Sequence, residues 1–163
     1  MSEVRSSEVP SRTIVLPDAA ATDALGRRIG ARLQSGQGVA LVGDLGAGKT
    51  SLTRGIGFGL GLEDPAAVCS PTYLLVIEHP GPVPLVHIDA YLPGKTRGFL
   101  EDGGLDYIDE TRGVVVVEWA ERLEDLLPEE TLWITMLHLD GGRQARLEDR
   151  VGAFGWLAAF ADE

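Results

Sequence analysis

The chain has 163 residues, of which 44% are hydrophobic and 24% charged, and its 25 acidic and 14 basic side chains give a formal net charge of -11. This length and composition predict one globular domain with its own core and exclude a fibrous or largely disordered protein. The acidic balance disfavours direct binding to nucleic acid or to an anionic membrane beyond about one Debye length, roughly 10 Å at 0.1 M salt. We therefore expect any nucleic acid to be reached through a partner protein.

The cysteine content and the N-terminal residues indicate the compartment. Cys69 is the single cysteine and cannot form an internal disulfide. Residues 1–12 hold no apolar stretch that could serve as a secretory signal, and no window approaches the roughly 18 consecutive apolar residues of a membrane span. We expect a cytoplasmic protein without membrane contact, in which residues 1–12 form a disordered arm and residues 13–163 form the single domain.

The first part of the chain predicts alternating strands and helices. Residues 13–16 read as a short strand, and Pro17-Asp18 begins a helix whose apolar positions recur at helical spacing. Residues 39–42 are a continuous apolar run, as in a buried parallel strand, and residues 49–60 follow as a second helix. Three positions of that helix are glycine, each about 1 kcal/mol less favourable than alanine. We expect close packing or mobility there.

The second part of the chain predicts further strands at 73–78, 83–89 and 114–118, with the segment 91–113 as surface loop and short helix. Residues 132–139 and 144–147 flank a glycine-containing turn and read as a β-hairpin. The apolar residues from 151 to 160 suggest a last helix. These elements predict an α/β domain whose central sheet is mostly parallel, with an antiparallel hairpin at one edge.

The strongest motif is GDLGAGKTSL at 43–52, directly after the strand at 39–42. It satisfies the Walker A pattern G-x-x-x-x-G-K-[ST] between a predicted strand and a predicted helix. Glycines let successive backbone N–H groups turn inward around phosphates, Lys49 neutralises the terminal phosphates, and the Thr50 hydroxyl can bind Mg²⁺. The sequence therefore predicts a three-layer P-loop NTPase that binds ATP and Mg²⁺. The residues expected to hold the nucleotide are Gly43, Asp44, Leu45, Gly46, Ala47, Gly48, Lys49, Thr50 and Ser51.

A second GKT, at Gly94 to Thr96, does not complete the same pattern. Asp89 stands where the first glycine is required, and Pro93, which has no N–H, precedes Gly94. We expect Lys95 to lie in a solvated loop.

Two acids end predicted strands, where α/β sheets bind ligands. Glu118 ends VVVVE and Asp89 ends VHID, and a P-loop hydrolase needs such an acid to hold Mg²⁺ or to align the attacking water. Which of the two is the main metal acid stays open. His87 would share a face with Asp89 if the strand persists, although a lone strand histidine is more often structural. The segment Ser70 to Tyr73 is either a phosphate-sensing switch or a simple turn.

Five motifs in this order, GDLGAGKT, SPTY, HIDAY, VEWAER and GRQAR, resemble the TsaE family, formerly YjeE, of bacterial ATPases needed for threonylcarbamoyladenosine in tRNA. The resemblance runs from about Leu16 to Leu147. It implies an ATPase that is weak alone, acts with the TsaD and TsaB proteins and reaches tRNA only through that complex.

The resemblance also implies roles for single residues. Lys49 and Thr50 would bind phosphate and Mg²⁺, Glu118 would serve the metal site, and Asp89 and Thr72 would line the reaction centre. Three arginines could bind phosphate or pair with surface acids, and we assign Arg143 to the nucleotide; the three are Arg122, Arg143 and Arg146.

One residue departs from the family pattern, which usually has arginine directly after the tyrosine of H-x-D-x-Y. Leu92 stands there, and Arg97 is the nearby candidate to replace it. Two other functions are compatible with the P-loop: a small-molecule kinase that uses the loop 91–113 as its lid, and a non-catalytic ATP-dependent assembly switch. A GTPase is excluded, because guanine recognition uses an N-K-x-D motif and the chain contains no asparagine.

Overall fold

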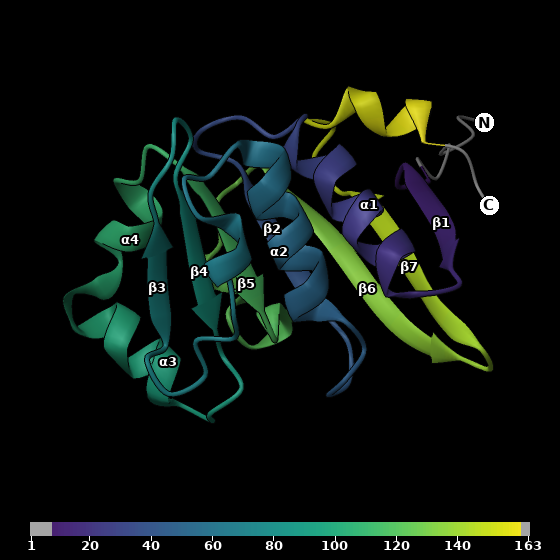
Figure 1. The fold of residues 1–163 in the computed structure, drawn as a ribbon. Helices are drawn as coiled ribbons and strands as arrows, with labels where there is room; N and C mark the ends of the chain where they lie inside the picture. Colours follow the sequence, from purple (N-terminus) through teal and green to yellow (C-terminus); the bar gives the residue numbers. More distant parts are fainter. Residues whose placement is uncertain (1–7, 161–163) are drawn as a thin grey trace, which may run out of the picture.

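The computed structural model describes residues 8–160 and shows a seven-stranded mixed sheet with helices on both faces (Figure 1). The strand order is β1-β7-β6-β2-β5-β4-β3. The strands are β1 (Ser11–Leu16), β2 (Gly38–Val42), β3 (Val76–His79), β4 (Leu85–Asp89), β5 (Val114–Glu118), β6 (Thr131–Leu139) and β7 (Gly142–Asp149). The α-helices are α1 (Ala19–Gly30), α2 (Lys49–Leu60), α3 (Lys95–Phe99) and α4 (Asp106–Asp109).

The centre of the sheet is parallel and both edges are antiparallel. β2 pairs in parallel with β5 and β6, and β4 pairs in parallel with β5. β6 and β7 form the predicted hairpin, while β1 on β7 and β3 on β4 add further antiparallel pairs. The α/β class and the hairpin are thus confirmed, and the sheet is more mixed than the sequence predicted.

The two faces of the sheet are covered by different elements because successive strand residues point to opposite sides. Val39 and Leu41 of β2 belong to a core cluster with residues of α1 and α2. Ala40, between them, belongs to a second cluster that contains Leu100 and Ile108 from the region of α3 and α4. This arrangement gives the three layers that the sequence predicts.

Glycines allow α1 and α2 to touch backbone to backbone. A Cβ on Gly26 would lie 2.5 Å from the carbonyl oxygen of Leu52, and a Cβ on Gly59 would lie 2.3 Å from that of Arg27. Figure 1 shows the two helices side by side over the sheet. Close packing on α1 therefore explains Gly55 and Gly59 of α2, whereas Gly57 faces the side chains of Leu62 and Val68.

Several boundaries differ from those predicted. β1 begins at Ser11, so the last two residues of the predicted arm, Ser11 and Arg12, belong to the sheet, while residues 1–7 lie outside the described residues. β3 covers only Val76–His79, because Tyr73 and Leu74 lie in a turn and are exposed. The predicted last helix is a 3-10 helix over Gly155–Ala159.

The segment 91–113, predicted as surface loop and short helix, contains the short helices α3 and α4, and the stretch Leu100–Gly104 between them is kinked at Asp102 and Gly103. Leu100 and Ile108 of this segment are buried in the second core cluster. Within residues 8–160, no helix combines the length and the apolar character needed to cross a membrane.

Candidate functional site

The loop between β2 and α2 has a backbone that requires glycine. Gly43, Gly46 and Gly48 have φ angles of 150°, 75° and 101°, in the region that L residues rarely adopt. A Cβ on Gly43 would lie 2.5 Å from the carbonyl oxygen of Met136, and one on Gly48 would lie 2.6 Å from Nη1 of Arg143. The loop therefore folds as a tight cradle around the N-terminus of α2.

Backbone donors of this cradle are available for an anion. Ala47 donates its N–H to the carbonyl oxygen of Asp44 at 3.1 Å, and Leu52 donates to Gly48 at 2.9 Å. Among the described residues, no acceptor is recorded for the other backbone N–H groups from Gly46 to Ser51. Helix N-termini with such donors bind phosphate groups.

Lys49 supplies the positive charge of the loop. Its side chain is buried, and its Nζ donates to the carbonyl oxygens of Gly43 at 2.5 Å and Asp44 at 2.8 Å. The ammonium also lies 4.4 Å from the centroid of the Trp119 ring. Burial lowers the pKa of Lys49 below its usual 10.5, and the nearby carboxylate of Glu118 partly opposes that shift.

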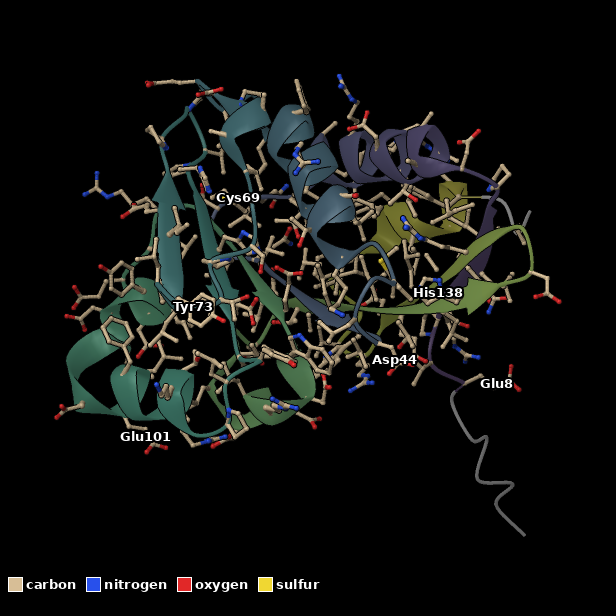
Figure 2. The ribbon with its side chains drawn as sticks, turned by 60° about the horizontal axis from the view of Figure 1, so that its bottom comes forward. Glu8, Asp44, Cys69, Tyr73, Glu101 and His138 are labelled. Atoms are coloured by element: carbon tan, nitrogen blue, oxygen red, sulfur yellow. The ribbon has the colours of Figure 1, made fainter. Side chains whose placement is uncertain are left out.

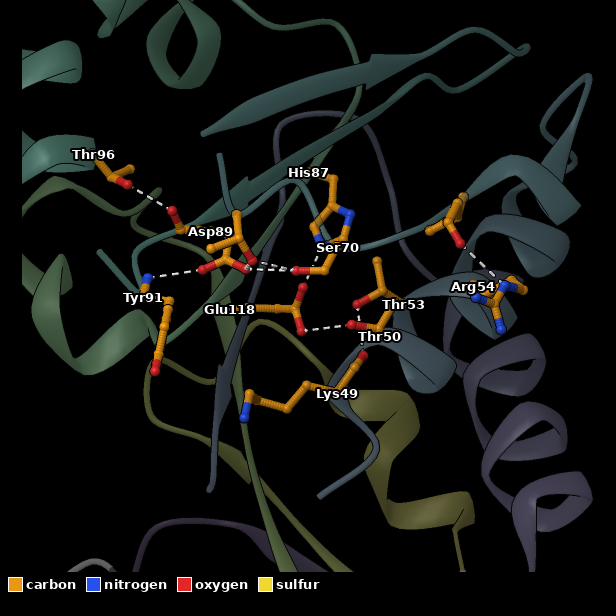
Figure 3. Close-up of polar contacts among 12 residues, drawn as sticks. Lys49, Thr50, Thr53, Arg54, Ser70, His87, Asp89, Tyr91, Thr96 and Glu118 are labelled. Atoms are coloured by element: carbon orange, nitrogen blue, oxygen red, sulfur yellow. Dashed lines mark hydrogen bonds and ion pairs between the residues drawn. The ribbon is translucent and has the colours of Figure 1, made fainter. Parts of the chain in front are cut away.

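Glu118 links the loop to the sheet (Figure 3). It ends β5 and is paired in register with Asp89 of β4, so both acids lie at the carboxyl ends of adjacent parallel strands, as the sequence predicts. Its Oε1 accepts a hydrogen bond from the Thr50 hydroxyl at 3.0 Å, and its Oε2 lies 2.7 Å from Nε2 of His87. The structure thus joins the hydroxyl of the Walker motif to a strand-end acid.

Asp89 holds the segment that begins with Ser70. Its Oδ2 accepts hydrogen bonds from the hydroxyls of Ser70 at 2.7 Å and Thr72 at 3.0 Å, and its Oδ1 accepts one from the backbone N–H of Tyr91 at 2.7 Å. Sequence reasoning named Thr72 and missed Ser70 as a site residue, although the motif SPTY contains both. The hydroxyl spacing in that motif was the available signal.

These groups line one cavity of about 530 Å³, a size typical of small-ligand sites. We call it the site cavity. Asp89, Glu118 and Thr72, predicted as catalytic, all line it, and Gly43, Asp44 and Ala47 of the predicted loop do not. Its lining residues are Leu45, Gly46, Gly48, Lys49, Thr50, Ser51, Ser70, Thr72, Tyr73, Asp89, Tyr91, Glu118, Trp119 and Arg143.

The three arginines left open by the sequence lie in different places. Arg143 lines the site cavity beside Gly48. Arg122 donates to the carbonyl oxygens of Ala90 and Tyr91 and its guanidinium lies 4.9 Å from the Trp119 ring centroid. Arg146 pairs on the surface with Glu148 at 2.9 Å.

Arg97, the candidate to replace the arginine at the position of Leu92, lines a small cavity together with Leu92. It forms ion pairs with Glu101 at 3.1 Å and Asp125 at 2.5 Å and donates to the carbonyl oxygen of Arg122, outside the site cavity. In the second GKT, Lys95 is exposed, as predicted, but it begins α3 and does not lie in a loop.

A second cavity of about 280 Å³ shares Arg143 with the site cavity. Its walls come from the junction of β1 and α1 and from the β6–β7 turn. Figure 2 shows His138, near the end of β6, on the same side as Asp44 of the glycine loop, and His138 Nε2 would lie 3.7 Å from a Cβ on Gly46. The lining residues are Leu16, Pro17, Asp18, Ala19, His138, Gly141, Gly142 and Arg143.

The donor set fits Mg²⁺ bound together with a phosphate ligand. Within the described residues, no group of three or more His, Cys, Asp or Glu side chains could hold a metal ion unaided. Mg²⁺ in nucleotide sites needs fewer protein ligands, because it is held by one or two protein oxygens, phosphate oxygens and water. The hydroxyl of Thr50 and the carboxylate of Glu118 supply such oxygens next to the phosphate cradle.

The parallel strands, the glycine loop and the adjacent strand-end acid define an α/β protein of the P-loop NTPase type. The family model for "Threonylcarbamoyl adenosine biosynthesis protein TsaE" matches residues 16–146. The chain therefore belongs to the TsaE family, whose role is threonylcarbamoyladenosine modification of tRNA.

Individual relatives agree with this membership. The TsaE protein of Streptomyces coelicolor is 46% identical over 112 residues, 66% of this chain and 73% of the relative. That of Mycobacterium tuberculosis H37Rv is 34% identical over 154 residues, 88% of this chain and 86% of the relative. The crystal structure of YdiB from Bacillus subtilis matches with a TM-score of 0.74 and 28% identity, covering 94% of this chain and 95% of that chain.

Proposed function

We propose that this protein is a Mg²⁺-dependent ATPase that works in the cytoplasm with the TsaD and TsaB proteins to support threonylcarbamoyladenosine formation in tRNA. The observation that carries the ATPase proposal is the 3.0 Å hydrogen bond between the Thr50 hydroxyl and Glu118 at the head of α2. It combines a phosphate cradle with a metal acid, which P-loop hydrolases require.

The phosphates would be held by the glycine loop. The backbone N–H groups at the start of α2 and the Lys49 ammonium supply donors at the bottom of the site cavity, and Arg143 adds a guanidinium at its wall. These groups act over a few ångströms, so the overall charge of -11 does not prevent binding of a triphosphate. Lys49 would exchange its carbonyl partners for phosphate oxygens.

The base would lie in the second cavity, on the other side of Arg143. Leu16 and Pro17 offer apolar contact to a heterocycle, while Asp18 and His138 offer polar groups at its edge. The Asp18 carboxylate already accepts the backbone N–H of Ala21 through Oδ1 at 2.8 Å as the cap of α1.

Thr50 and Glu118 would hold Mg²⁺, which when bound withdraws charge from the terminal phosphates and orients them for attack by water. Asp89 would orient that water together with the hydroxyls of Ser70 and Thr72, because these three polar groups lie next to each other and line the site cavity. Positioning and electrostatics of this kind account for most of the catalysis in phosphoryl transfer.

The partner part of the proposal is supported by family membership and by the acidic surface. A chain with 25 acidic side chains is poorly suited to hold tRNA directly. Partner proteins would therefore hold the RNA, and this chain would contact it only indirectly.

The kinase alternative finds little support in the geometry. From the segment 91–113, Tyr91 is the residue that lines the site cavity, so α3 and α4 do not form a lid over it. The switch alternative shares the nucleotide site and differs in whether hydrolysis is needed.

Replacing Glu118 by glutamine tests the ATPase against the switch. Glu118→Gln should keep ATP binding, lose hydrolysis by about 10²-fold or more, and fail to support threonylcarbamoyladenosine formation in a reconstituted reaction. Glu129→Gln is the control, since Glu129 is exposed and does not line the site cavity. Full modification activity in the Glu118→Gln protein would contradict the ATPase and favour the switch.

A further inference from the structure

His87 contacts Glu118 of the candidate site from inside the core. Its side chain is fully buried on β4, where its backbone pairs with Val116 of β5. The ring does not line the site cavity. Its contact with the site is the 2.7 Å approach of Nε2 to Oε2 of Glu118.

The two ring nitrogens have different surroundings. Nδ1 is buried and has no hydrogen-bond partner within residues 8–160, whereas Nε2 faces a carboxylate oxygen. A carboxylate accepts hydrogen bonds, so Nε2 must carry the hydrogen. A hydrogen on Nδ1 as well would be a buried donor without an acceptor, so Nδ1 keeps its lone pair. The ring is thus a fixed donor to Glu118.

Glu118 is held at both oxygens. Oε2 takes the hydrogen bond of His87, and Oε1 takes that of the Thr50 hydroxyl at 3.0 Å. Because Glu118 is buried, water has little access to replace a lost donor at Oε2. Without His87 the carboxylate could rotate and offer Oε1 and Oε2 to Thr50 in turn.

We propose that His87 is a positioning residue that fixes the carboxylate of Glu118 so that Oε1 faces Thr50 and Mg²⁺. This inference rests on the proposed function, because it assigns a ligand orientation within the same site. Removing a residue that hydrogen-bonds to a metal ligand, without itself contacting the metal, typically lowers metal affinity by about 10–100-fold.

The experiment compares two amide variants of His87 by calorimetric titration of ATP with and without Mg²⁺. The amide nitrogen of Gln can take the place of Nε2, whereas that of Asn reaches only the place of Nδ1. His87→Asn should reduce the gain in ATP affinity on adding Mg²⁺ by about 10–100-fold, and His87→Gln should keep it. Binding of ATP without Mg²⁺ should be the same in both.

A purely structural histidine would behave differently, and His79 provides that control. It is buried on β3, its Nε2 also lacks a partner within the described residues, and it does not line the site cavity. His79→Asn should lower the thermal stability and leave the Mg²⁺ gain unchanged. A wild-type Mg²⁺ gain in His87→Asn, or an equal loss in His87→Gln, would overturn the inference.

Two further outcomes separate this inference from the proposed function. Absence of any Mg²⁺ gain in the wild-type protein would refute the proposed function itself. Nitrogen-15 spectra of the wild-type histidine rings need no variant to fold. They should show His87 with its hydrogen on Nε2, and a ring with its hydrogen on Nδ1 only would overturn the positioning role.

Discussion

The contact between α1 and α2 predicts that one added methyl group at Gly55 destabilises the protein. A Cβ there would lie 2.6 Å from the carbonyl oxygen of Asp23 and 3.0 Å from Cα of Gly26. Both are backbone atoms of α1, so they cannot move aside by a change of side-chain rotamer. The helices must move apart, and α2 carries Lys49 and Thr50 in its first turn.

Two effects of opposite sign set the magnitude for Gly55→Ala. Alanine is favoured over glycine in a helix interior by about 1 kcal/mol, while overpacking a tight contact costs about 1–3 kcal/mol. A contact of 2.6 Å with backbone belongs at the upper end of that range. We expect a net loss of about 1–2 kcal/mol, which for a protein of this size lowers Tm by about 2–8 °C.

Gly57→Ala is the matched control in the same helix. A Cβ at Gly57 would lie 2.9 Å from Cδ1 of Leu62 and 3.4 Å from Cγ2 of Val68, which are side-chain atoms that can shift. Its Tm should stay close to that of the wild type. Thermal unfolding followed by circular dichroism, with ATP affinity measured alongside, checks both variants. If Gly55→Ala proved as stable as Gly57→Ala, the close-packing argument would be wrong.

Three further predictions concern the site. Gly48→Ala places a side chain at φ 101° and 2.6 Å from Nη1 of Arg143. The free loop relieves this strain by leaving the cradle conformation, and returning to it costs about 1–2 kcal/mol, so ATP binding should weaken roughly tenfold. Unchanged affinity in calorimetry would contradict the cradle. Burial lowers the pKa of Lys49 in the free protein, and a phosphate partner raises it. ATP affinity should therefore be constant at a pH below the pKa of Lys49 in the free protein and fall as the pH rises above it, with proton uptake on binding. An affinity that increases with pH in that range would refute the role of Lys49. Leu74 is 72% exposed and does not line the site cavity. Leu74→Ser should therefore leave Mg²⁺-ATP affinity unchanged and weaken capture by TsaD and TsaB in a pull-down, and equal capture would show that this turn is not a contact surface.

The parallel centre of the fold could be predicted because its signals are local. The apolar runs 39–42 and 114–117 read as buried strands. The glycine loop, which follows the first run and precedes a helix, indicates where the chain passes from the sheet to a helix layer. The edges could not be predicted as well. Tyr73 and Leu74 look like strand residues, yet Leu75 adopts a left-handed φ of 67° and the ladder with β4 starts only at Val76.

The site was predictable in the same uneven way. Glu118 could be paired with Thr50 because Glu118 ends β5, Thr50 follows β2, and both strands end at the same edge of the sheet. The contact of Ser70 with Asp89 joins a turn to a strand 19 residues away, and no periodicity reports such a contact. The donation from His87 to Glu118 depends on strand register between β4 and β5, which the sequence does not reveal.

The burial of side chains in residues 95–108 was also missed, since short helical turns carry weak patterns. Leu100 and Ile108 stand in a segment rich in acidic residues and glycine, which is typical of a surface loop, although both pack against the sheet. Tertiary contacts, more than local propensity, determine whether such short segments form helices.

The most direct test of the proposed nucleotide site is a calorimetric titration of the wild-type protein with ATP, in the presence and absence of Mg²⁺. Saturable binding that Mg²⁺ strengthens and that Lys49→Ala abolishes is the predicted result. No measurable binding of Mg²⁺-ATP, even with TsaB and TsaD added, would contradict it.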